Sequence, residues 1–547
     1  MKKFTAMNRR RFLQTMAVGA GASLLPDNTL QADSQSGRRR PNLVFIFSDQ
    51  QSNDMLGCYG NKQVITPNLD HFGAESLRFT NCISQYPVCT PYRSMLLSGQ
   101  HVMYNGCLQN SIRMLPGEGR YFGEVLRDAG YKTGYIGKWH LFGCQTTPID
   151  KGIYRYGFDG TFLSNNCDMD TFWPGKGYYY NETGEKVFFE EWEPYGQTRQ
   201  ALEFLDNCEE EKPFALFLSW HAPHDQHPFS GHSCYEAPSE LMARYDPDKL
   251  ILRPNCDEEL FRQYKASHQE YIGQCSDIRT DYHGYYAMCN GIDNAFGQIM
   301  EKLKLKNLAE DTIVVYTSDH GCSMGSWTSD IYNVARREDI TLKAAMPKII
   351  ATTKGTPHDW SIRVPLMIRW PGHLKPRVTP LLFGTLDFMP TLLSMMNLTI
   401  PSGCQGSDLY LYIDKQDDEA VESLPIFSTW WSGVFTHRYT YASTFASMDK
   451  GWMWDRQKDP WQMYNLHYTN TNKSLRDSLH TETVKHMARF GVRPVNHEQL
   501  VRKSLGLNLS TSAEALNRFL FTPGKGLPVG RPVDIAKSLP GLWPELK

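Results

Sequence analysis

The chain has 547 residues, of which 41% are hydrophobic and 21% are charged, as in an ordinary globular protein. This composition excludes a collagen-like, coiled-coil or largely disordered architecture. The 57 Lys and Arg residues nearly balance the 59 Asp and Glu residues, which leaves a formal net charge of −2. The chain therefore has no basic excess that would predict binding to nucleic acid or to an anionic membrane surface.

The first 32 residues are predicted to be a twin-arginine-type signal peptide rather than part of the fold. The basic segment Arg9–Arg11 precedes a weakly apolar run over Thr15–Leu25, and the small residue Ala32 ends the segment. The run is shorter than the ~20 apolar residues that span a bilayer, and no later window reaches that length. We therefore expect an exported, periplasmic protein without a membrane span.

Five short apolar runs predict buried strands of a parallel sheet, and two segments with helical spacing lie between them. The predicted strands are Leu43–Phe47, Thr133–Ile136, Phe214–Leu218, Thr312–Tyr316 and Val364–Ile368, and the predicted helices are Arg120–Ala129 and Tyr285–Leu305. The alternation of strands and helices predicts an α/β fold.

Three other segments complete the predicted organisation. Residues 155–200 are rich in Gly, Tyr, Trp and acidic residues and are interpreted as an insertion of loops, and Trp327–Thr353 is interpreted as a second insertion. Beyond residue 405 the sequence becomes aromatic and turn-rich, which predicts a smaller α+β subdomain over residues 406–547. Residues 33–405 are then the larger, N-terminal domain.

Polar clusters follow four of the predicted strands directly, at Asp49-Gln50, Gly137–His140, Ser219–His224 and Ser318–Gly321. In open α/β sheets, ligands bind just beyond the carboxyl ends of the strands. The four clusters are therefore predicted to converge on one site.

The 13 cysteines are scattered and contain no C-x-x-C pair, which excludes zinc-ribbon and thioredoxin-like sites. Their odd number leaves at least one cysteine unpaired within an exported chain, and we expect that one to be Cys89. It stands where a helix is predicted to begin, with Pro91 in the first turn and Arg93 one turn later. Because helix N-termini favour anions, this position suits a negatively charged group.

The string from Cys89 to Arg93, C-x-P-x-R, resembles the signature of the type I, formylglycine-dependent sulfatases of the alkaline phosphatase superfamily. Asp387–Leu393 and Asp455–Leu466 resemble further segments of that family. The resemblance implies the fold: a large mixed, mostly parallel sheet sandwiched by helices, with a smaller C-terminal α+β subdomain.

The resemblance also implies the chemistry at Cys89. A maturation enzyme would oxidise this cysteine to formylglycine (3-oxoalanine), whose hydrate is the nucleophile. One hydroxyl of the gem-diol attacks sulfur and the alcohol leaves; deprotonation of the second hydroxyl then regenerates the aldehyde and releases sulfate. An ester formed on a plain thiol could not release sulfate in this way.

A divalent cation is predicted beside Cys89. Asp49 and Asp319 end two predicted strands, and carboxylates suit a hard cation such as Ca²⁺, with Mg²⁺ or Mn²⁺ as alternatives. Gln50 and His320 complete the predicted ligand set with Cys89. The combination of Asp49-Gln50 with Asp319-His320 resembles the choline-sulfatase and phosphonate-monoester-hydrolase side of the superfamily.

Motif context assigns the other predicted catalytic residues. Lys138 and Lys354 resemble the two lysines that hold sulfate, and Arg93 is a fixed cation beside Cys89. Cations aimed at a transferring sulfuryl group stabilise developing charge.

Three further side chains complete the predicted site. His140 resembles the histidine that orients the formylglycine diol. His224 resembles the histidine near the leaving-group oxygen, although His221 and His227 compete for that role. Asn110 is predicted to face the substrate, as are Lys138, His224 and Lys354.

The sequence therefore predicts a sulfatase that hydrolyses O-sulfate esters. The aromatic-rich insertions and the export signal favour a sulfated carbohydrate as substrate. One alternative is a phosphonate or phosphate ester hydrolase of the same superfamily. The other is a catalytically inactive glycan-binding protein in which the Cys89 thiol persists. The expected partners are a sulfated substrate and the maturation enzyme; the sugar, the sulfated position and the oligomeric state are left open.

Overall fold

The structure of the chain is a computed structural model that describes residues 40–110, 112–114, 119–143, 147–165, 174–175, 177–209, 211–226, 233–267, 277–349, 351–444 and 447–490. The predicted signal peptide and His227 lie outside these residues. No helix among the described residues is both long enough and apolar enough to cross a membrane.

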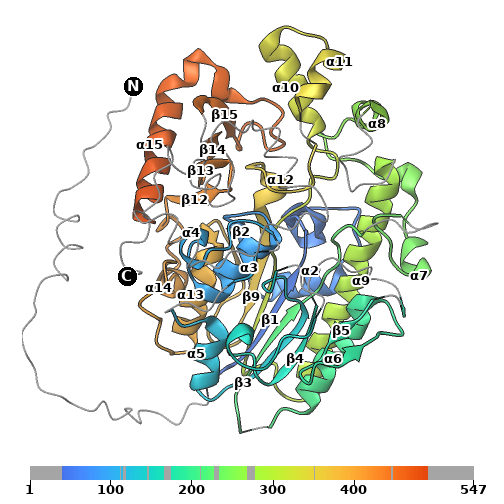
Figure 1. Cartoon of the computed structure of the whole chain (residues 1–547), viewed down its shortest axis with the longest axis vertical. Coiled ribbons are helices and arrows are strands. Elements are labelled where there is room, and N and C mark those ends of the chain that lie inside the picture. Colours follow the sequence, from blue (N-terminus) through green and yellow to red (C-terminus); the bar gives the residue numbers. More distant parts are fainter. Residues whose placement is uncertain are drawn as a thin grey trace, which may run out of the picture. The chain divides into compact units, whose positions relative to one another are not determined.

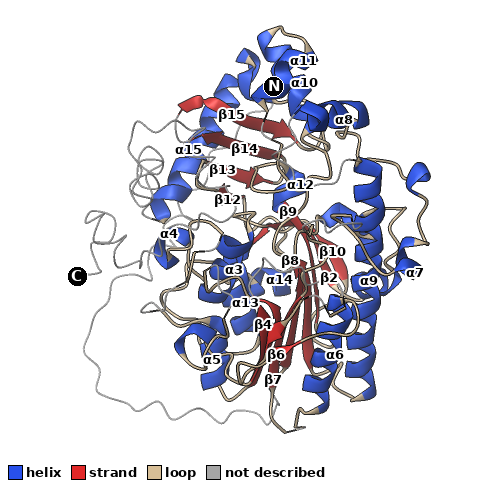
Figure 2. Ribbon diagram, turned by 45° about the vertical axis from the view of Figure 1, so that its right-hand side comes forward, coloured by secondary structure: helices blue, strands red, loops and turns tan. Residues whose placement is uncertain are grey.

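One large sheet forms the centre of the fold (Figures 1 and 2). Its strands are β1 (Asn42–Ser48), β2 (Leu77–Ile83), β3 (Lys132–Lys138), β4 (Thr161–Asn165), β5 (Tyr179–Tyr180), β6 (Lys186–Val187), β7 (Phe214–Ser219), β8 (Thr312–Ser318), β9 (Arg363–Arg369), β10 (Arg377–Thr379) and β11 (Phe383–Gly384). Their order is β10-β2-β9-β8-β1-β7-β3-β4-β5-β6, and β11 also pairs with β2.

The middle of this sheet is parallel. Strands β8, β1, β7, β3 and β4 run in one direction, and β9 lies antiparallel between β8 and β2. Every residue of β1 is buried, because both faces of the strand are covered. The prediction of a large mixed, mostly parallel sheet is confirmed, and all five predicted strands are present.

Helices cover both faces of the sheet (Figure 2). The α-helices are α2 (Pro67–Ala74), α3 (Cys89–Ser98), α4 (Val102–Asn105), α5 (Phe122–Asp128), α6 (Glu193–Asp206), α7 (Ser239–Met242), α8 (Glu258–Ser267), α9 (Ile278–Leu305), α10 (Thr328–Glu338), α11 (Leu342–Ala345), α12 (Asp359–Ile362), α13 (Phe388–Met395), α14 (Tyr410–Lys415) and α15 (Lys473–Arg489). Val44 and Ile46 of β1 pack with α2, α6 and α9, whereas Leu43, Phe45 and Phe47 pack with α3, α5 and α13. Alternate side chains of one strand therefore bind the two helical layers to the sheet.

Helix α9 begins seven residues before the predicted start at Tyr285. Asp277 caps it, because its carboxylate accepts hydrogen bonds from the backbone N–H groups of the first turn. Gly284 interrupts the apolar spacing, but it allows close packing: a Cβ there would lie 1.8 Å from the Tyr235 carbonyl oxygen. The glycine is therefore a packing site rather than a helix boundary.

The interpretation of residues 155–200 as an insertion of loops is wrong. Strand β4 pairs in parallel with β3, β5 and β6 extend the same sheet, and α6 begins at Glu193. Phe204 and Leu205 of α6 pack into the core beneath the sheet. The strands were missed because they are short and interrupted by polar and glycine residues. Over Trp327–Thr353, the second predicted insertion, the chain forms the short helices α10 and α11.

The C-terminal part contains a second, antiparallel sheet covered by α15 (Figure 1, orange and red). Its strands, in spatial order, are β12 (Ser423–Phe427), β13 (Trp431–Thr436), β14 (Tyr439–Thr444) and β15 (Ser447–Asp455). This agrees with the predicted α+β subdomain. Leu409 and Ile413, however, pack in the core of the large sheet, and the boundary after residue 405 stays a prediction.

Candidate active site

Four neighbouring parallel strands bring the predicted clusters together. Asp49 follows β1, Asp319 follows β8, Lys138 ends β3, and Ser219 ends β7. These strands are adjacent in the sheet, so their carboxyl ends meet at one edge. All four side chains are fully buried.

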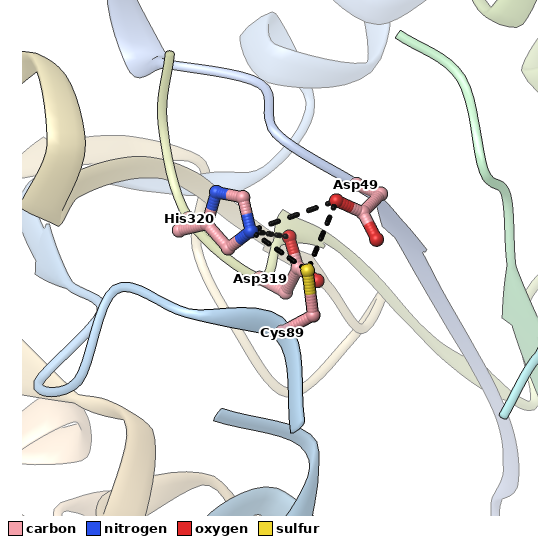
Figure 3. Close-up of side chains that lie close together, drawn as sticks. All are labelled: Asp49, Cys89, Asp319 and His320. Carbon is pink, nitrogen blue, oxygen red and sulfur yellow. Dashed lines mark hydrogen bonds and ion pairs between the residues drawn. The ribbon is translucent and has the colours of Figure 1, made fainter. Parts of the chain in front are cut away.

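Cys89 is the first residue of α3, so its predicted place at a helix start is confirmed. Its Sγ lies 3.2 Å from His320 Nε2 and 3.7 Å from Asp49 Oδ1 (Figure 3). The amino groups of two lysines are also close, at 3.3 Å for Lys354 and 3.6 Å for Lys138. The cysteine is thus surrounded by the predicted metal ligands and sulfate-binding lysines.

The carboxylates of Asp49 and Asp319, the Cys89 sulfur and a His320 ring nitrogen offer ligand atoms within 4.8 Å of one another. His320 Nδ1 lies 3.0 Å from the Gly321 carbonyl, which can only accept, so Nδ1–H donates; Nε2, which faces Cys89 Sγ and Asp49, is the nitrogen that could ligate. This buried cluster fits a metal site.

Gln50 adds a second observation in favour of a cation. Its amide nitrogen donates to Asp225 Oδ1 at 2.8 Å, whereas its Oε1 is buried and has no hydrogen-bond partner among the described residues. Its backbone has a positive φ of 67°, and its N–H donates to Asp319 Oδ1 at 3.1 Å. A buried acceptor in the residue that directly follows Asp49 suits a hard cation.

Arg93 joins the two carboxylates that the cation would share. Its Nη2 lies 3.0 Å from both Asp49 Oδ2 and Asp319 Oδ2. Its Nη1 donates to the Lys138 carbonyl at 2.7 Å and to Ser219 Oγ at 2.6 Å. One guanidinium therefore links the ends of β1, β8, β3 and β7. Burial opposes its charge, but Asp319, Tyr135, Asp49 and Cys89 together outweigh burial and raise the pKa of Arg93.

The electrostatic field favours negative charge at position 89. Burial opposes ionisation of the Cys89 thiol, but Lys138, Lys354 and His320 outweigh burial and hold its pKa well below the usual value. Burial and the charge of Cys89 likewise oppose ionisation of Asp49, yet Lys138, His224 and Arg93 hold its pKa well below the ordinary range. The site can therefore accommodate an anionic group.

His140 and Asn110 both contact the first turn of α3. His140 hydrogen-bonds the Cys89 side chain, and its carbonyl accepts from Thr90 Oγ1 at 2.8 Å. The Asn110 Oδ1 accepts from the Thr90 N–H at 3.0 Å. This hydrogen bond holds the Asn110 amide at the start of α3, where its NH₂ group could serve as the predicted substrate contact.

His224 is the histidine that the structure places beside Lys354. Its Nε2 lies 2.7 Å from Lys354 Nζ and 4.0 Å from Asp49 Oδ1. His221 is instead buried, 3.7 Å from Glu193, and burial followed by the charge of Lys138 holds its pKa well below the usual value. Of these two candidates, only His224 lies beside Lys354, and its role at the leaving group stays a prediction.

Three partners of these residues were not predicted from the sequence. Asp225 binds Gln50, Ser219 binds Arg93, and Glu193 pairs with His221. Ser219 and Asp225 belong to or directly follow a predicted strand-end cluster, which was a usable signal. Glu193 lies in the segment interpreted as loops. Cys89 is a free cysteine in the structure.

The comparisons with known proteins agree with this geometry. A family model described as Sulfatase matches residues 41–398, and one described as N-sulphoglucosamine sulphohydrolase, C-terminal, matches residues 353–489. The first match covers more than half of the chain, and the chain therefore belongs to the sulfatase family. It is a sulfuric ester hydrolase of alkaline-phosphatase-like fold.

Relatives match nearly the whole chain. An ulvan-active sulfatase of Formosa agariphila is 29% identical, with 91% of both chains covered. Arylsulfatase A of Homo sapiens is 28% identical over 78% of this chain and 83% of its own length. The crystal structure of a putative sulfatase from Bacteroides fragilis is 28% identical, with a TM-score of 0.70, and the match covers 86% of this chain and 99% of that one.

A phosphonate monoester hydrolase of Agrobacterium radiobacter shares the fold. Its TM-score is 0.62, but it is only 18% identical over 82% of this chain and 96% of its own. This likeness concerns the fold alone.

Proposed function

We propose that the enzyme hydrolyses O-sulfate esters of a carbohydrate, using formylglycine made from Cys89 and a bound divalent cation, Ca²⁺ in the first instance. The reaction takes R–O–SO₃⁻ and water to R–OH, sulfate and a proton. The observation that supports it is the position of Cys89: at a helix start, between two lysines and beside a buried cluster of oxygen and nitrogen donors.

The Cys89 Sγ marks the position of the reacting group. The hydrated aldehyde would supply an oxygen nucleophile that a thiol lacks. Lys138 and Lys354 approach this position to 3.6 and 3.3 Å, where they can neutralise two oxygens of the sulfuryl group. His140, hydrogen-bonded to the same side chain, is placed to receive a proton from it.

Asp49, Gln50, Asp319 and His320 would hold the cation. Such a cation supplies Lewis-acid chemistry: it lowers the pKa of a bound hydroxyl and neutralises sulfate oxygens. Arg93 contacts the Oδ2 atoms of both carboxylates, whereas their Oδ1 atoms face His320. Arg93 thereby keeps the two carboxylates oriented. His224, beside Lys354, is placed to give a proton to the departing alkoxide.

The carbohydrate substrate is supported by the names of relatives. Besides the ulvan-active sulfatase, an endo-4-O-sulfatase of Bacteroides thetaiotaomicron is 28% identical, with 81% of this chain and 91% of its own covered. The chain shares their length and most of their sequence span. The twin-arginine pattern of residues 1–32 supports export to the periplasm, where such glycans are met.

The experiment has two parts. A peptide mass of the segment around Cys89, taken from protein matured in its own host or with a maturation enzyme, should show formylglycine. The same protein should release sulfate from members of a sulfated-glycan panel, and its Cys89→Ala variant should not. A persistent thiol in active protein would contradict the mechanism; a persistent thiol in inactive protein that still binds glycans would support the binding-protein alternative.

The presence of both Gln50 and His320 in the predicted ligand set favours phosphonate ester hydrolysis as a second candidate function. Rates on the sulfate and the phosphonate monoester of one alcohol separate the two. We expect the sulfate ester to have the higher kcat/KM, and a reversed order would favour the second candidate.

A further inference from the structure

Gln50 can ligate a cation only through its carbonyl oxygen, so the orientation of its amide decides whether it ligates at all. The amide is planar, and a rotation of half a turn exchanges Oε1 for Nε2. Three groups of the described residues contact the Nε2 end: Asp225 Oδ1 at 2.8 Å, Tyr235 OH at 3.3 Å and Cys322 Sγ at 3.4 Å. The opposite end, Oε1, is buried, and no group in the described part of the chain forms a hydrogen bond with it.

Two of these three contacts do not distinguish the two orientations of the amide. A tyrosine hydroxyl and a thiol can each donate or accept, so Tyr235 and Cys322 would tolerate either end of Gln50. The Asp225 carboxylate, when ionised, only accepts. Only Asp225 therefore requires the NH₂ end and turns the carbonyl away from itself.

The backbone keeps Asp225 where it can act in this way. The Asp225 carbonyl lies 2.5 Å from His224 Nδ1, and His224 Nε2 lies 2.7 Å from Lys354 Nζ, so a chain of contacts holds the Asp225 backbone in place. The side chain of Asp225 is 15% exposed, so its charge is only partly screened by water.

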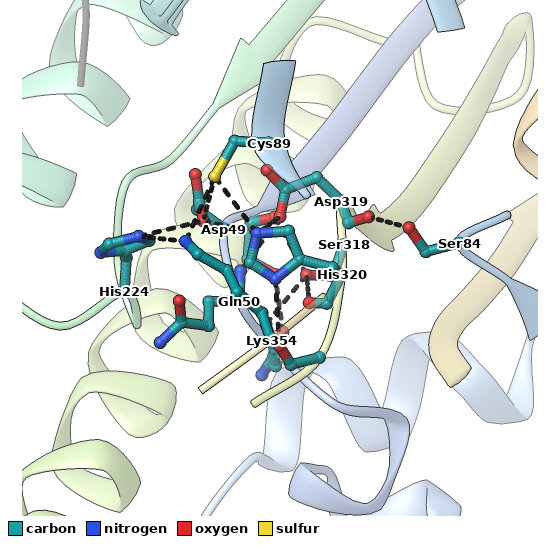
Figure 4. Close-up of polar contacts among 12 residues, drawn as sticks. Asp49, Gln50, Ser84, Cys89, His224, Ser318, Asp319, His320 and Lys354 are labelled. Atoms are coloured by element: carbon teal, nitrogen blue, oxygen red, sulfur yellow. Dashed lines mark hydrogen bonds and ion pairs between the residues drawn. The ribbon is translucent and has the colours of Figure 1, made fainter. Parts of the chain in front are cut away.

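We propose that Asp225 is a positioning residue that fixes the Gln50 amide with its carbonyl toward the cation. The inference rests on the proposed function, because it assumes a cation among Asp49, Gln50, Asp319 and His320. Figure 4 shows Gln50, His224 and Lys354 gathered beside Asp49. Loss of the Asp225 carboxylate leaves both amide orientations accessible, and the cation then meets an NH₂ group part of the time.

The test is a double-mutant cycle on Ca²⁺ affinity. Titration calorimetry of the matured, metal-depleted full chain gives the Ca²⁺ Kd of the wild type, Asp225→Ala, Gln50→Ala and the double variant. We expect each single substitution to weaken binding by ~10–100-fold, as for groups that orient metal ligands. The double variant should bind no more weakly than Gln50→Ala alone, since Asp225 acts through Gln50.

A purely electrostatic role of Asp225 predicts a different result. Removing a negative charge near a cation would weaken binding equally in both backgrounds, so the two effects would add. Additive effects, or an unchanged Kd in Asp225→Ala, overturn the proposal. If Asp225→Ala does not fold, Asp225→Asn keeps the volume and should show a smaller loss that also vanishes in the Gln50→Ala background.

The matched control is Asp159→Ala. Asp159 has a similarly buried side chain, at 17% exposure, and pairs with Arg127 at 3.0 Å. It precedes β4 and so lies at the opposite edge of the sheet from the strand ends of the site. Its Ca²⁺ Kd should equal that of the wild type. A wild type that binds no Ca²⁺ contradicts the proposed function itself, whereas a wild type that binds normally beside an unaffected Asp225→Ala contradicts only this inference.

Discussion

The residues around Cys89 form two sets that differ in how the fold places them. The inner set consists of Asp49, Cys89, Arg93, Lys138 and Asp319, which lie at strand ends or at the start of α3 and are at most 1% exposed. The outer set consists of Asn110, His224, Asp225 and Lys354, which lie in loops and are partly exposed. The sheet fixes the positions of the inner set, and in the proposed mechanism the loops supply the remaining contacts to the substrate and to Gln50.

This comparison predicts that the largest loss comes from the centre of the inner set. Cys89→Ala should lower kcat/KM for sulfate release by at least about 10⁴-fold, because it removes the nucleophile that no neighbour replaces. The change is a small one in a buried site, so the melting temperature should stay close to that of the wild type. Sulfate release measured beside a melting curve checks both statements. Activity within tenfold of the wild type would place the nucleophile elsewhere.

Arg93 tests the stability of the inner set. Arg93→Ala leaves Asp49 and Asp319 buried without their shared counter-ion, and removal of one partner from a buried ion pair costs about 3–5 kcal/mol. Urea unfolding in metal-free buffer measures the loss. The control is Arg199→Ala, whose side chain is 48% exposed and pairs with Glu191 on the surface; it should cost less than about 1 kcal/mol. Equal losses in the two variants would show that the buried pairs are not special.

The two lysines connect the inner set to the outer one. Lys138→Ala and Lys354→Ala should each lower kcat/KM by ~10²–10³-fold if they act as oxyanion donors. Lys348→Ala is the matched control, because Lys348 is close in sequence to Lys354 but 49% exposed and paired with Glu338. Steady-state kinetics on one sulfate ester are sufficient. A loss below about threefold in either lysine variant would remove that lysine from the sulfate site.

The inner set could be predicted from the sequence, because each member follows an apolar strand or opens a helix. Asp49, Lys138 and Asp319 share one rule, that neighbouring parallel strands end at one edge. The contact between Gln50 and Asp225 could not be predicted, since loop conformation decides it and the residues are 175 positions apart. The prediction that residues 155–200 are loops was wrong for a related reason. Short strands such as β5 are recognised by the strands they pair with, not by their own sequence pattern.

A buried carboxylate outside the site shows what the cations of the inner set do. Asp387 is 5% exposed and receives the N–H groups of Gly384 and Ser407, at 2.9 and 2.8 Å, but the structure describes no ion pair for it. Burial raises its pKa to about 6, in the direction opposite to Asp49. Burial thus dominates the pKa of Asp387, whereas Lys138, His224 and Arg93 outweigh burial at Asp49.

The sign of this shift sets a pH dependence of stability. Because the folded state holds the Asp387 proton more tightly than the unfolded chain, the stabilisation is complete below the unfolded pKa of about 4 and is lost as pH rises through about 6. Relative to Asp387→Asn, which cannot titrate, the wild type should lose about 1 kcal/mol between about pH 5 and about pH 7.5. Any hydrogen bond that the amide fails to replace costs the same at both pH values and cancels. Urea unfolding of the two proteins at the two pH values measures the difference.

Asp206→Asn is the control: a hydrogen bond from Lys302 lowers the pKa of Asp206, so its loss of stability lies below this pH range and the difference should not change. A constant difference for Asp387→Asn would mean that burial does not govern this carboxylate.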